Sequence, residues 1–118
     1  MRTILVVDDE WAIAEVLEAL LGDEGYRVIV ANNGKQGLER LAEWRPDLIM
    51  LDFMMPVMDG PATFAALKAD PKTASIPIIL MSSLPEETVA QRCSGYDTFL
   101  RKPFRIAAVL EAVNKALG

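Results

Sequence analysis

Three apolar runs of this chain are too short for helices and too continuous for strands with one solvent-facing side. They cover residues 4–7, 48–51 and 78–81 and contain only aliphatic side chains and methionine. Such runs are typical of strands that are buried on both faces of a parallel sheet. Residues 26–31 and 98–100 predict two further strands. We therefore expect the core to form around one buried sheet.

Segments with helical spacing separate the predicted strands. The apolar residues expected to face the core are Ile13, Val16, Leu17, Leu20 and Leu21, then Leu38, Leu41 and Ala42, then Phe64 and Leu67, and finally Ile106, Val109, Leu110, Val113 and Leu117. This spacing gives each helix one apolar stripe. Residues 86–92 are a weaker helical segment, with only Val89 and Ala90 for an inner face. Strands that alternate with helices favour an α/β fold with a doubly wound parallel sheet.

The composition limits the functions that this chain can serve. Its 118 residues suit a single domain, residues 1–118. A net charge of −5 argues against binding to nucleic acid, and the absence of histidine excludes histidine-based catalysis. The single cysteine, Cys93, fits a reducing compartment. No apolar stretch approaches the ~20 residues that span a bilayer, so we expect a cytoplasmic protein without membrane contact.

Four of the predicted strands end on residues suited to phosphate chemistry. Asp8 and Asp9 follow residues 4–7, Asp52 follows residues 48–51, Ser82 follows residues 78–81, and Lys102 follows the last strand. Parallel neighbours would bring these ends to one edge of the sheet, where open α/β sheets bind their ligands. The sequence therefore predicts a crevice with three carboxylates, a hydroxyl and an ammonium group.

Each of these residues has both a structural and a chemical interpretation. Asp8 or Asp9 fits a helix N-cap, but adjacent carboxylates also suit a hard cation such as Mg²⁺. Asp52 fits the start of a loop, but a carboxylate beside a metal can attack a phosphoryl group and carry it. Ser82 fits a turn and Lys102 a surface group, but both could bind phosphoryl oxygens. Their joint arrangement favours the chemical interpretation.

The same residues resemble the motifs of a known family. Residues 2–117 are similar to a response-regulator receiver domain of the chemotaxis-regulator type in two-component signalling. The matching motifs are Val7-Asp8-Asp9-Glu10, Asp52 with residues 53–60, Ser82, and Lys102-Pro103-Phe104. The resemblance implies a three-layer, flavodoxin-like fold with a five-stranded parallel sheet of order 2-1-3-4-5 and helices on both faces.

For the site, the resemblance implies that Asp52 is the phosphoacceptor in a two-component system or phosphorelay. Catalytic roles fall to Asp52, Ser82 and Lys102. The implied metal is Mg²⁺, with Mn²⁺ as a substitute, and its ligands are Asp8, Asp9, Asp52 and the backbone carbonyl of Met54. No other cofactor is implied.

The resemblance also implies how the signal is passed on. The switch residues are Ser82 and Phe99, because a hydroxyl that moves to the phosphoryl group leaves space for the aromatic ring. We expect a signalling module with self-directed phosphoryl transfer and autodephosphorylation, not an enzyme with an external substrate. Its phosphoryl source would be a histidine kinase or histidine phosphotransfer protein, facing Trp11, Glu15 and Glu18. Its output would be a downstream protein target or fused effector, with a homodimer through the fourth helix, fifth strand and fifth helix as an option.

Two other classes and one departure from the family pattern bear on this interpretation. A haloacid-dehalogenase-like phosphatase would need an aspartate at the position of Met54, and it usually has a cap. A flavodoxin-like cofactor carrier would need a phosphate loop rich in Gly, Ser or Thr, which this chain lacks. The departure is that Met54 and Leu84, two residues after Asp52 and Ser82, are both apolar. Our hypothesis is that they slow the loss of the phosphoryl group by giving the attacking water no polar contact.

Overall fold

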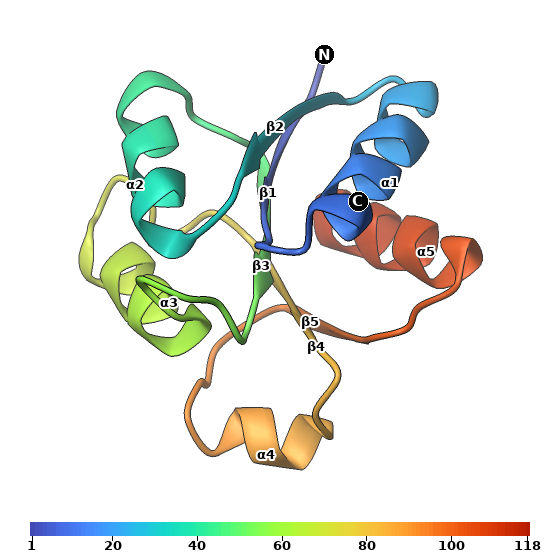
Figure 1. The fold of residues 1–118 in the computed structure, drawn as a ribbon. Helices are drawn as coiled ribbons and strands as arrows, with labels where there is room; N and C mark the ends of the chain where they lie inside the picture. Colours follow the sequence, from blue (N-terminus) through green and yellow to red (C-terminus); the bar gives the residue numbers. More distant parts are fainter.

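The computed structural model describes residues 1–118, which form one five-stranded parallel sheet flanked by helices. The strand order is β2-β1-β3-β4-β5, as predicted (Figure 1). The strands are β1 (Thr3–Val7), β2 (Arg27–Ala31), β3 (Leu48–Asp52), β4 (Ile78–Ser82) and β5 (Thr98–Arg101). The helices are α1 (Trp11–Asp23), α2 (Gly34–Glu43), α3 (Gly60–Ala69), α4 (Glu86–Ala90) and α5 (Ile106–Leu117).

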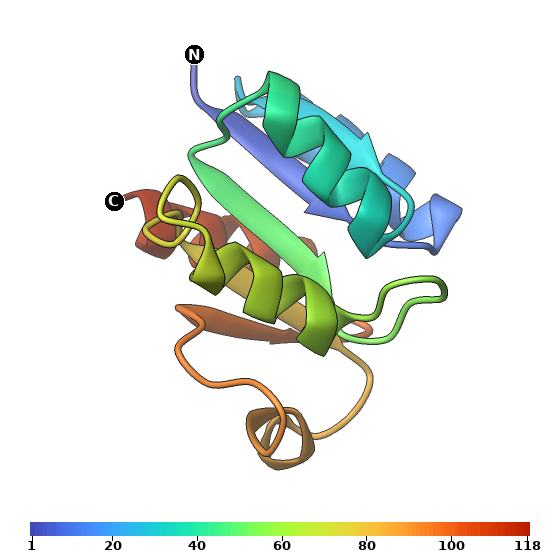
Figure 2. The same cartoon turned by 90° about the vertical axis from the view of Figure 1, so that its left-hand side faces the viewer.

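Helices cover both faces of this sheet. The helices α1 and α5 lie on one face, and α2 and α3 lie on the other, so the molecule has three layers (Figure 1). The short helix α4 lies apart from these layers, below β4 and β5 in this view. The turned view in Figure 2 shows the strands side by side with their arrowheads toward the same edge. The predicted flavodoxin-like fold is therefore confirmed.

The buried strands supply two core clusters, one on each face of the sheet. Ile4 and Val6 belong to the cluster under α1 and α5, and Leu5 and Val7 belong to the cluster under α2 and α3. This division follows from the two-residue period of a strand. Both β3 and β4 are buried along their whole length, which confirms that they have no solvent-facing side.

Three residues in the predicted apolar stripes of α1, α2 and α5 lie on the surface instead of facing the core. Val16 and Ile106 are 56% and 60% exposed, and Ala42 is also exposed. The helical repeat gives each helix a broad apolar stripe, but the sheet covers only the centre of that stripe. In α1 the buried residues include Leu17, and the neighbouring Val16 points about 100° away around the helix axis. The prediction was wrong at the margins of the stripes.

The helix predicted for residues 86–92 is shorter in the structure. It ends at Ala90, and Val89 is its only buried residue, while Ala90 is exposed. Five residues make little more than one helical turn, so a single side chain can reach the core. Arg92, predicted to be the last helical residue, lies in the turn that follows α4.

The ends of the strands hold the predicted site residues at fixed positions. Asp52 closes β3 and Ser82 closes β4, while Asp8 and Lys102 lie one residue past β1 and β5. The backbone N–H groups of Asp8 and Lys102 still donate to neighbouring strands, with N···O distances of 3.0 and 2.8 Å. The peptide bond between Lys102 and Pro103 is cis. All four side chains therefore start from the carboxyl edge of the sheet.

Candidate functional site

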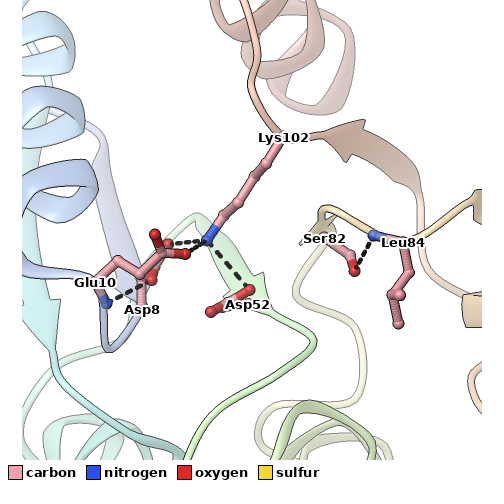
Figure 3. A network of polar contacts seen from close by, with 6 residues as sticks. All are labelled: Asp8, Glu10, Asp52, Ser82, Leu84 and Lys102. Atoms are coloured by element: carbon pink, nitrogen blue, oxygen red, sulfur yellow. Dashed lines mark hydrogen bonds and ion pairs between the residues drawn. The ribbon is translucent and has the colours of Figure 1, made fainter.

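The ammonium group of Lys102 lies among three carboxylates at the carboxyl edge (Figure 3). Its Nζ atom is 2.9 Å from Asp8 Oδ2, 2.7 Å from Glu10 Oε1 and 3.3 Å from Asp52 Oδ1. These residues follow or close β1, β3 and β5. The fold therefore gathers one cation and three anions from distant parts of the chain.

Asp8 serves both the start of α1 and this polar cluster. The backbone N–H of Glu10, the N-cap residue of α1, donates to Asp8 Oδ1 at 2.9 Å. The other carboxylate oxygen of Asp8 accepts from Lys102. The structural and the chemical interpretation of Asp8 are thus compatible, because each uses a different oxygen.

The cluster is buried and carries an excess of negative charge. Asp8 is fully buried, and Asp52 and Lys102 are 3% and 9% exposed. Burial opposes the charge of Lys102, but hydrogen bonds to Glu10 and Asp8 outweigh it and raise the pKa of this lysine above its usual value. Lys102 is therefore a permanent cation that neutralises only part of the carboxylate charge.

Asp52 lies in an environment that disfavours its ionised form. Burial and the nearby charge of Asp8 raise the pKa of Asp52 from 3.8 to about 7, against the opposite effect of Lys102. The neighbouring carboxyl group of Asp9 raises this pKa further. A further cation near Asp52 would therefore favour its charged form.

The donor set of the cluster fits a hard divalent cation. Carboxylate oxygens of Asp8, Glu10 and Asp52 lie within 4.8 Å of one another. Oxygen ligands of this kind suit Mg²⁺ and Mn²⁺, and the unbalanced negative charge favours a cation further. The residues present at the carboxyl edge are therefore suited to the metal that the sequence predicted.

Two acidic residues of this region, Glu10 and Asp9, lie differently from what the sequence alone indicates. Glu10 makes the shortest contact with Lys102, although it was noted only as part of a motif. Its position directly after the aspartate pair was the available signal. Asp9, predicted as a metal ligand, is exposed and is not one of the three residues with closely spaced oxygens.

The predicted switch residues Ser82 and Phe99 make no hydrogen bond to this cluster. The backbone N–H of Leu84 donates to Ser82 Oγ at 3.0 Å, which is the turn interaction considered from the sequence (Figure 3). Phe99 is half-buried, and its ring centroid is 6.5 Å from that of Tyr96. The structure therefore brings together Asp8, Asp52 and Lys102, but it leaves the hydroxyl of Ser82 bonded to its own loop.

The loop after β3 forms one wall of an open cavity of about 410 Å³ beside the cluster. Met54 lies in this loop with 58% of its side chain exposed. Asp9 lines the same cavity from the end of β1, and Arg92 lines it from the turn after α4. A small anion or a partner side chain could reach the carboxyl edge by this route.

Comparisons with known proteins agree with this arrangement. The family model described as "Response regulator receiver domain" matches residues 4–114. The DNA-binding dual master transcriptional regulator RpaA of Synechocystis is 35% identical to this chain over 119 residues. The match covers 99% of this chain and 49% of RpaA. The chain spans about half the length of the curated relatives that it matches.

Solved structures share the fold along nearly the whole chain. The response regulator TrrA of Thermotoga maritima, in complex with Mg²⁺ and BeF, has a TM-score of 0.88 and 32% identity, with coverage of 99% of this chain and 100% of TrrA. The receiver domain of a Pseudomonas aeruginosa sensor histidine kinase, with a magnesium ion in its active-site cleft, has a TM-score of 0.91 and 28% identity, with coverage of 99% and 98%. None of the helices in the present chain has the length and apolar character needed to cross a membrane.

Proposed function

Because the chain belongs to the family of response regulator receiver domains, we propose that residues 1–118 form one receiver domain in which Asp52 accepts a phosphoryl group. The observation that carries this proposal is the contact of the Lys102 ammonium with Asp8, Glu10 and Asp52. It joins a nucleophilic carboxylate, a phosphate-binding cation and an acidic metal-binding set in one crevice.

In the proposed reaction, a carboxylate oxygen of Asp52 attacks the phosphorus atom of a phosphohistidine. A new P–O bond forms to Asp52 while the P–N bond breaks, and the histidine nitrogen keeps the electron pair. Lys102 lies 3.3 Å from Asp52 Oδ1, so its ammonium group is close enough to donate to an oxygen of the arriving group. Asp8 and Glu10 hold this ammonium group at the site until then.

The proposed metal is Mg²⁺, with Mn²⁺ as a substitute. Its ligands are Asp8, Asp9, Asp52 and the backbone carbonyl of Met54, with Glu10 beside them. When bound, the ion supplies positive charge that offsets the charge developing on the transferring phosphoryl group.

The output of this domain is conformational and not a chemical product. Phosphorylation replaces the Asp52 carboxylate with an acyl phosphate, whose negatively charged phosphoryl oxygens attract the hydroxyl of Ser82 away from Leu84. The half-buried Phe99 then packs further inward. Hydrolysis of the acyl phosphate by the domain itself resets the switch.

The phosphoryl donor is a histidine kinase or histidine phosphotransfer protein that docks over the carboxyl edge. Exposed apolar side chains surround this edge, since Trp11 follows β1, Met54 and Val57 follow β3, and Ile106 follows β5. Their exposed fractions are 75%, 58%, 79% and 60%, respectively. Apolar residues gathered around a polar site are typical of a protein-binding surface. Glu15 and Glu18 of α1 would lie at its margin.

The response passes to a downstream protein or to a fused effector. Relatives such as RpaA and MtrA are named as DNA-binding regulators, and this chain matches only about half of their length. This supports an effector joined to the same polypeptide. A homodimer through α4, β5 and α5 is the proposed way to couple the switch to such an effector, and the setting is the cytoplasm.

The proposal is tested by phosphorylation with a small donor. We expect acetyl phosphate to add one phosphoryl group in the presence of Mg²⁺ and none in EDTA, as measured by intact mass. Asp52→Asn should abolish the addition, whereas Asp47→Asn, at the opposite edge of the sheet, should leave it intact. Addition that survives Asp52→Asn, or that needs no divalent cation, would refute the proposal.

A further inference from the structure

The backbone of Arg92 is held in place in the turn after α4. Its backbone N–H donates to Val89 O at 3.0 Å, and so does that of Cys93. Val89 and Cys93 are buried in the same core cluster as Phe53, the residue after Asp52. The turn after α4 is therefore anchored to the loop that follows β3, although α4 itself stands apart from the layers (Figure 1).

The side chain of Arg92 lines the open cavity beside the cluster together with Asp9 and Asp59. Its Nη2 atom is 3.6 Å from Asp59 Oδ2, and its guanidinium group lies 5.7 Å from the centre of the Phe53 ring. The ion pair is exposed, with 59% of the arginine side chain and 42% of the aspartate side chain accessible. Exposed pairs of this kind are weak, so Arg92 can leave Asp59 at little cost.

Asp59 restrains Arg92 with only one of its two carboxylate oxygens. The other oxygen, Oδ1, accepts from the backbone N–H of Ala62 at 2.9 Å and caps α3. An asparagine at this position can keep the cap while removing the negative charge. The two roles of Asp59 can therefore be separated by a single substitution.

The charges around the cavity oppose the entry of an anionic donor. The carboxylates of Asp8, Glu10 and Asp52 lie beside this cavity, and Lys102 is the cation that pairs with them. Among the residues that line the cavity, Asp9 and Asp59 are acidic and Arg92 is the only base. Every phosphoryl donor is an anion, so a cation at the entrance lowers the repulsion that the donor meets.

We propose that Arg92 binds the phosphate group of small anionic phosphoryl donors at the mouth of the cavity, and that Asp59 restrains it. This inference rests on the proposed function, and it names a donor-binding residue for the same site. With acetyl phosphate, the P–O bond to the acetyl group breaks, acetate leaves with the electron pair, and a P–O bond to Asp52 forms. Arg92 stays protonated throughout and forms no covalent bond.

The first test compares Arg92→Gln with a control substitution at another arginine that changes the net charge by the same amount. Arg92→Gln should lower the second-order rate constant for phosphorylation by acetyl phosphate about threefold at low salt, and Arg92→Lys should restore most of it. Arg27→Gln is the matched control, because Arg27 also lies over an aromatic ring, Trp44, but at the far end of the sheet. It should leave the rate constant unchanged. The rates are followed by intact mass in excess Mg²⁺.

Salt and donor charge give a readout that a merely structural role would not affect. The difference between the parent protein and Arg92→Gln should fade at about 1 M salt, where the Debye length is only about 3 Å. It should also be smaller for phosphoramidate, which carries less negative charge than acetyl phosphate. A difference that is independent of salt and donor would show that Arg92 acts through structure, and would overturn the inference.

A double-mutant cycle tests the restraint by Asp59. Asp59→Asn should raise the rate constant for acetyl phosphate, and this gain should vanish in the Arg92→Gln background. An equal gain in both backgrounds would mean that Asp59 acts only by its own charge, and would overturn the restraint.

The failure of this inference can be distinguished from the failure of the proposed function. If the parent protein shows no Mg²⁺-dependent labelling, the proposed function itself is refuted. If labelling is normal but Arg92→Gln and Arg27→Gln react at equal rates, only the role of Arg92 is refuted.

Discussion

At the scale of single residues, the Asp52 carboxyl lies between opposing influences. Burial and Asp8 disfavour its charge, while the Lys102 ammonium, 3.3 Å away, favours it. A buried group of this kind links its protonation to the stability of the fold. The same environment that prepares Asp52 for a cation therefore lowers the stability of the cation-free protein.

The first prediction concerns this linkage in metal-free protein. The pKa of Asp52 rises from 3.8 to about 7 on folding. Between these pH values the carboxyl group is therefore protonated in the folded protein and ionised in the unfolded chain. The resulting stabilisation is complete below pH 4 and is lost as the pH rises through 7. Asp52→Asn should therefore be more stable than the parent protein by about 1–3 kcal/mol at pH 8 and by a smaller amount at pH 5, where only part of the stabilisation of the parent has been lost.

Urea unfolding in EDTA at the two pH values measures this difference in the free energy of unfolding. Glu18→Gln, which removes an exposed carboxylate of α1, controls for the change in net charge. An Asp52→Asn difference that is the same at pH 5 and pH 8 would contradict the prediction.

The second prediction concerns the lifetime of the phosphorylated form. Met54 is exposed at the cavity and Leu84 is half-buried beside Ser82, so neither offers a hydrogen bond to an attacking water. Combining Met54→Asn with Leu84→Glu should speed dephosphorylation roughly tenfold, since polar groups can orient that water. The decay of the phosphorylated mass after removal of the donor measures the rate. Met54→Leu with Leu84→Met is the apolar control, and an equal rate for both double variants would reject the hypothesis.

At the scale of elements, the loop between β3 and α3 carries backbone strain. Val57 has a φ of 70°, and the N–H of Met58 donates to Pro56 O at 2.8 Å, so the three residues form a γ-turn with a left-handed centre. A β-branched residue in the left-handed region is an outlier, and this conformation costs about 1–2 kcal/mol.

The third prediction is that Val57→Asn relieves this strain. Asparagine tolerates positive φ, so the free energy of unfolding should rise by about 1 kcal/mol and the melting temperature by roughly 3–6 °C. Val57→Ile keeps the branched Cβ and should bring no gain. Thermal unfolding by circular dichroism compares the variants, and equal melting temperatures for Asn and Ile would argue against strain at this position.

The fourth prediction compares two glycines in helices. A Cβ at Gly60, the first residue of α3, would lie 2.5 Å from Phe53 Cα and 2.7 Å from Asp52 O, whereas one at Gly22 in α1 would have no atom within 4 Å. Gly60→Ala should lower the free energy of unfolding by about 1–3 kcal/mol and slow phosphorylation, because the end of β3 must move. Gly22→Ala should raise the free energy by about 0.5–1 kcal/mol without changing the rate. Urea unfolding and acetyl phosphate labelling test both parts, and a stable, fully active Gly60→Ala would contradict them.

At the scale of the whole molecule, the parallel sheet converts separation in sequence into contact in space. Lys102 and Asp8 are 94 residues apart but form a buried hydrogen bond, because β1 and β5 end at the same edge. Repulsion among the gathered carboxylates opposes folding, and a cation bound there offsets it. The site and the stability of the fold are therefore coupled.

The fifth prediction follows from this coupling. Mg²⁺ at 100 times its dissociation constant should add about 2.7 kcal/mol to the free energy of unfolding, because it binds only the folded chain. The gain should be largely lost in Asp8→Asn and Asp52→Asn and kept in Glu18→Gln. Unfolding of each variant with and without Mg²⁺ measures it, and an undiminished gain in Asp8→Asn would remove that residue from the metal site.

The amino-acid sequence alone was sufficient to predict the order of strands and helices and the edge of the sheet at which Asp8, Asp52 and Lys102 meet. The apolar runs could be interpreted without tertiary information because both faces of a central parallel strand are buried. Asp8, Asp52 and Lys102 could be placed together because parallel strands of one sheet end at one edge. These inferences depend on periodicity and strand direction, which are local properties of the chain.

Only the tertiary structure decided which groups touch. The contacts of Glu10 with Lys102 and of Arg92 with Asp59, the exposure of Val16, and the bond of Ser82 to its own loop depend on distances between separate elements. Local patterns do not encode such distances, since they result from how the layers pack. The raised pKa of Asp52 also arises in this way, because burial and neighbouring charge exist only once the chain has folded.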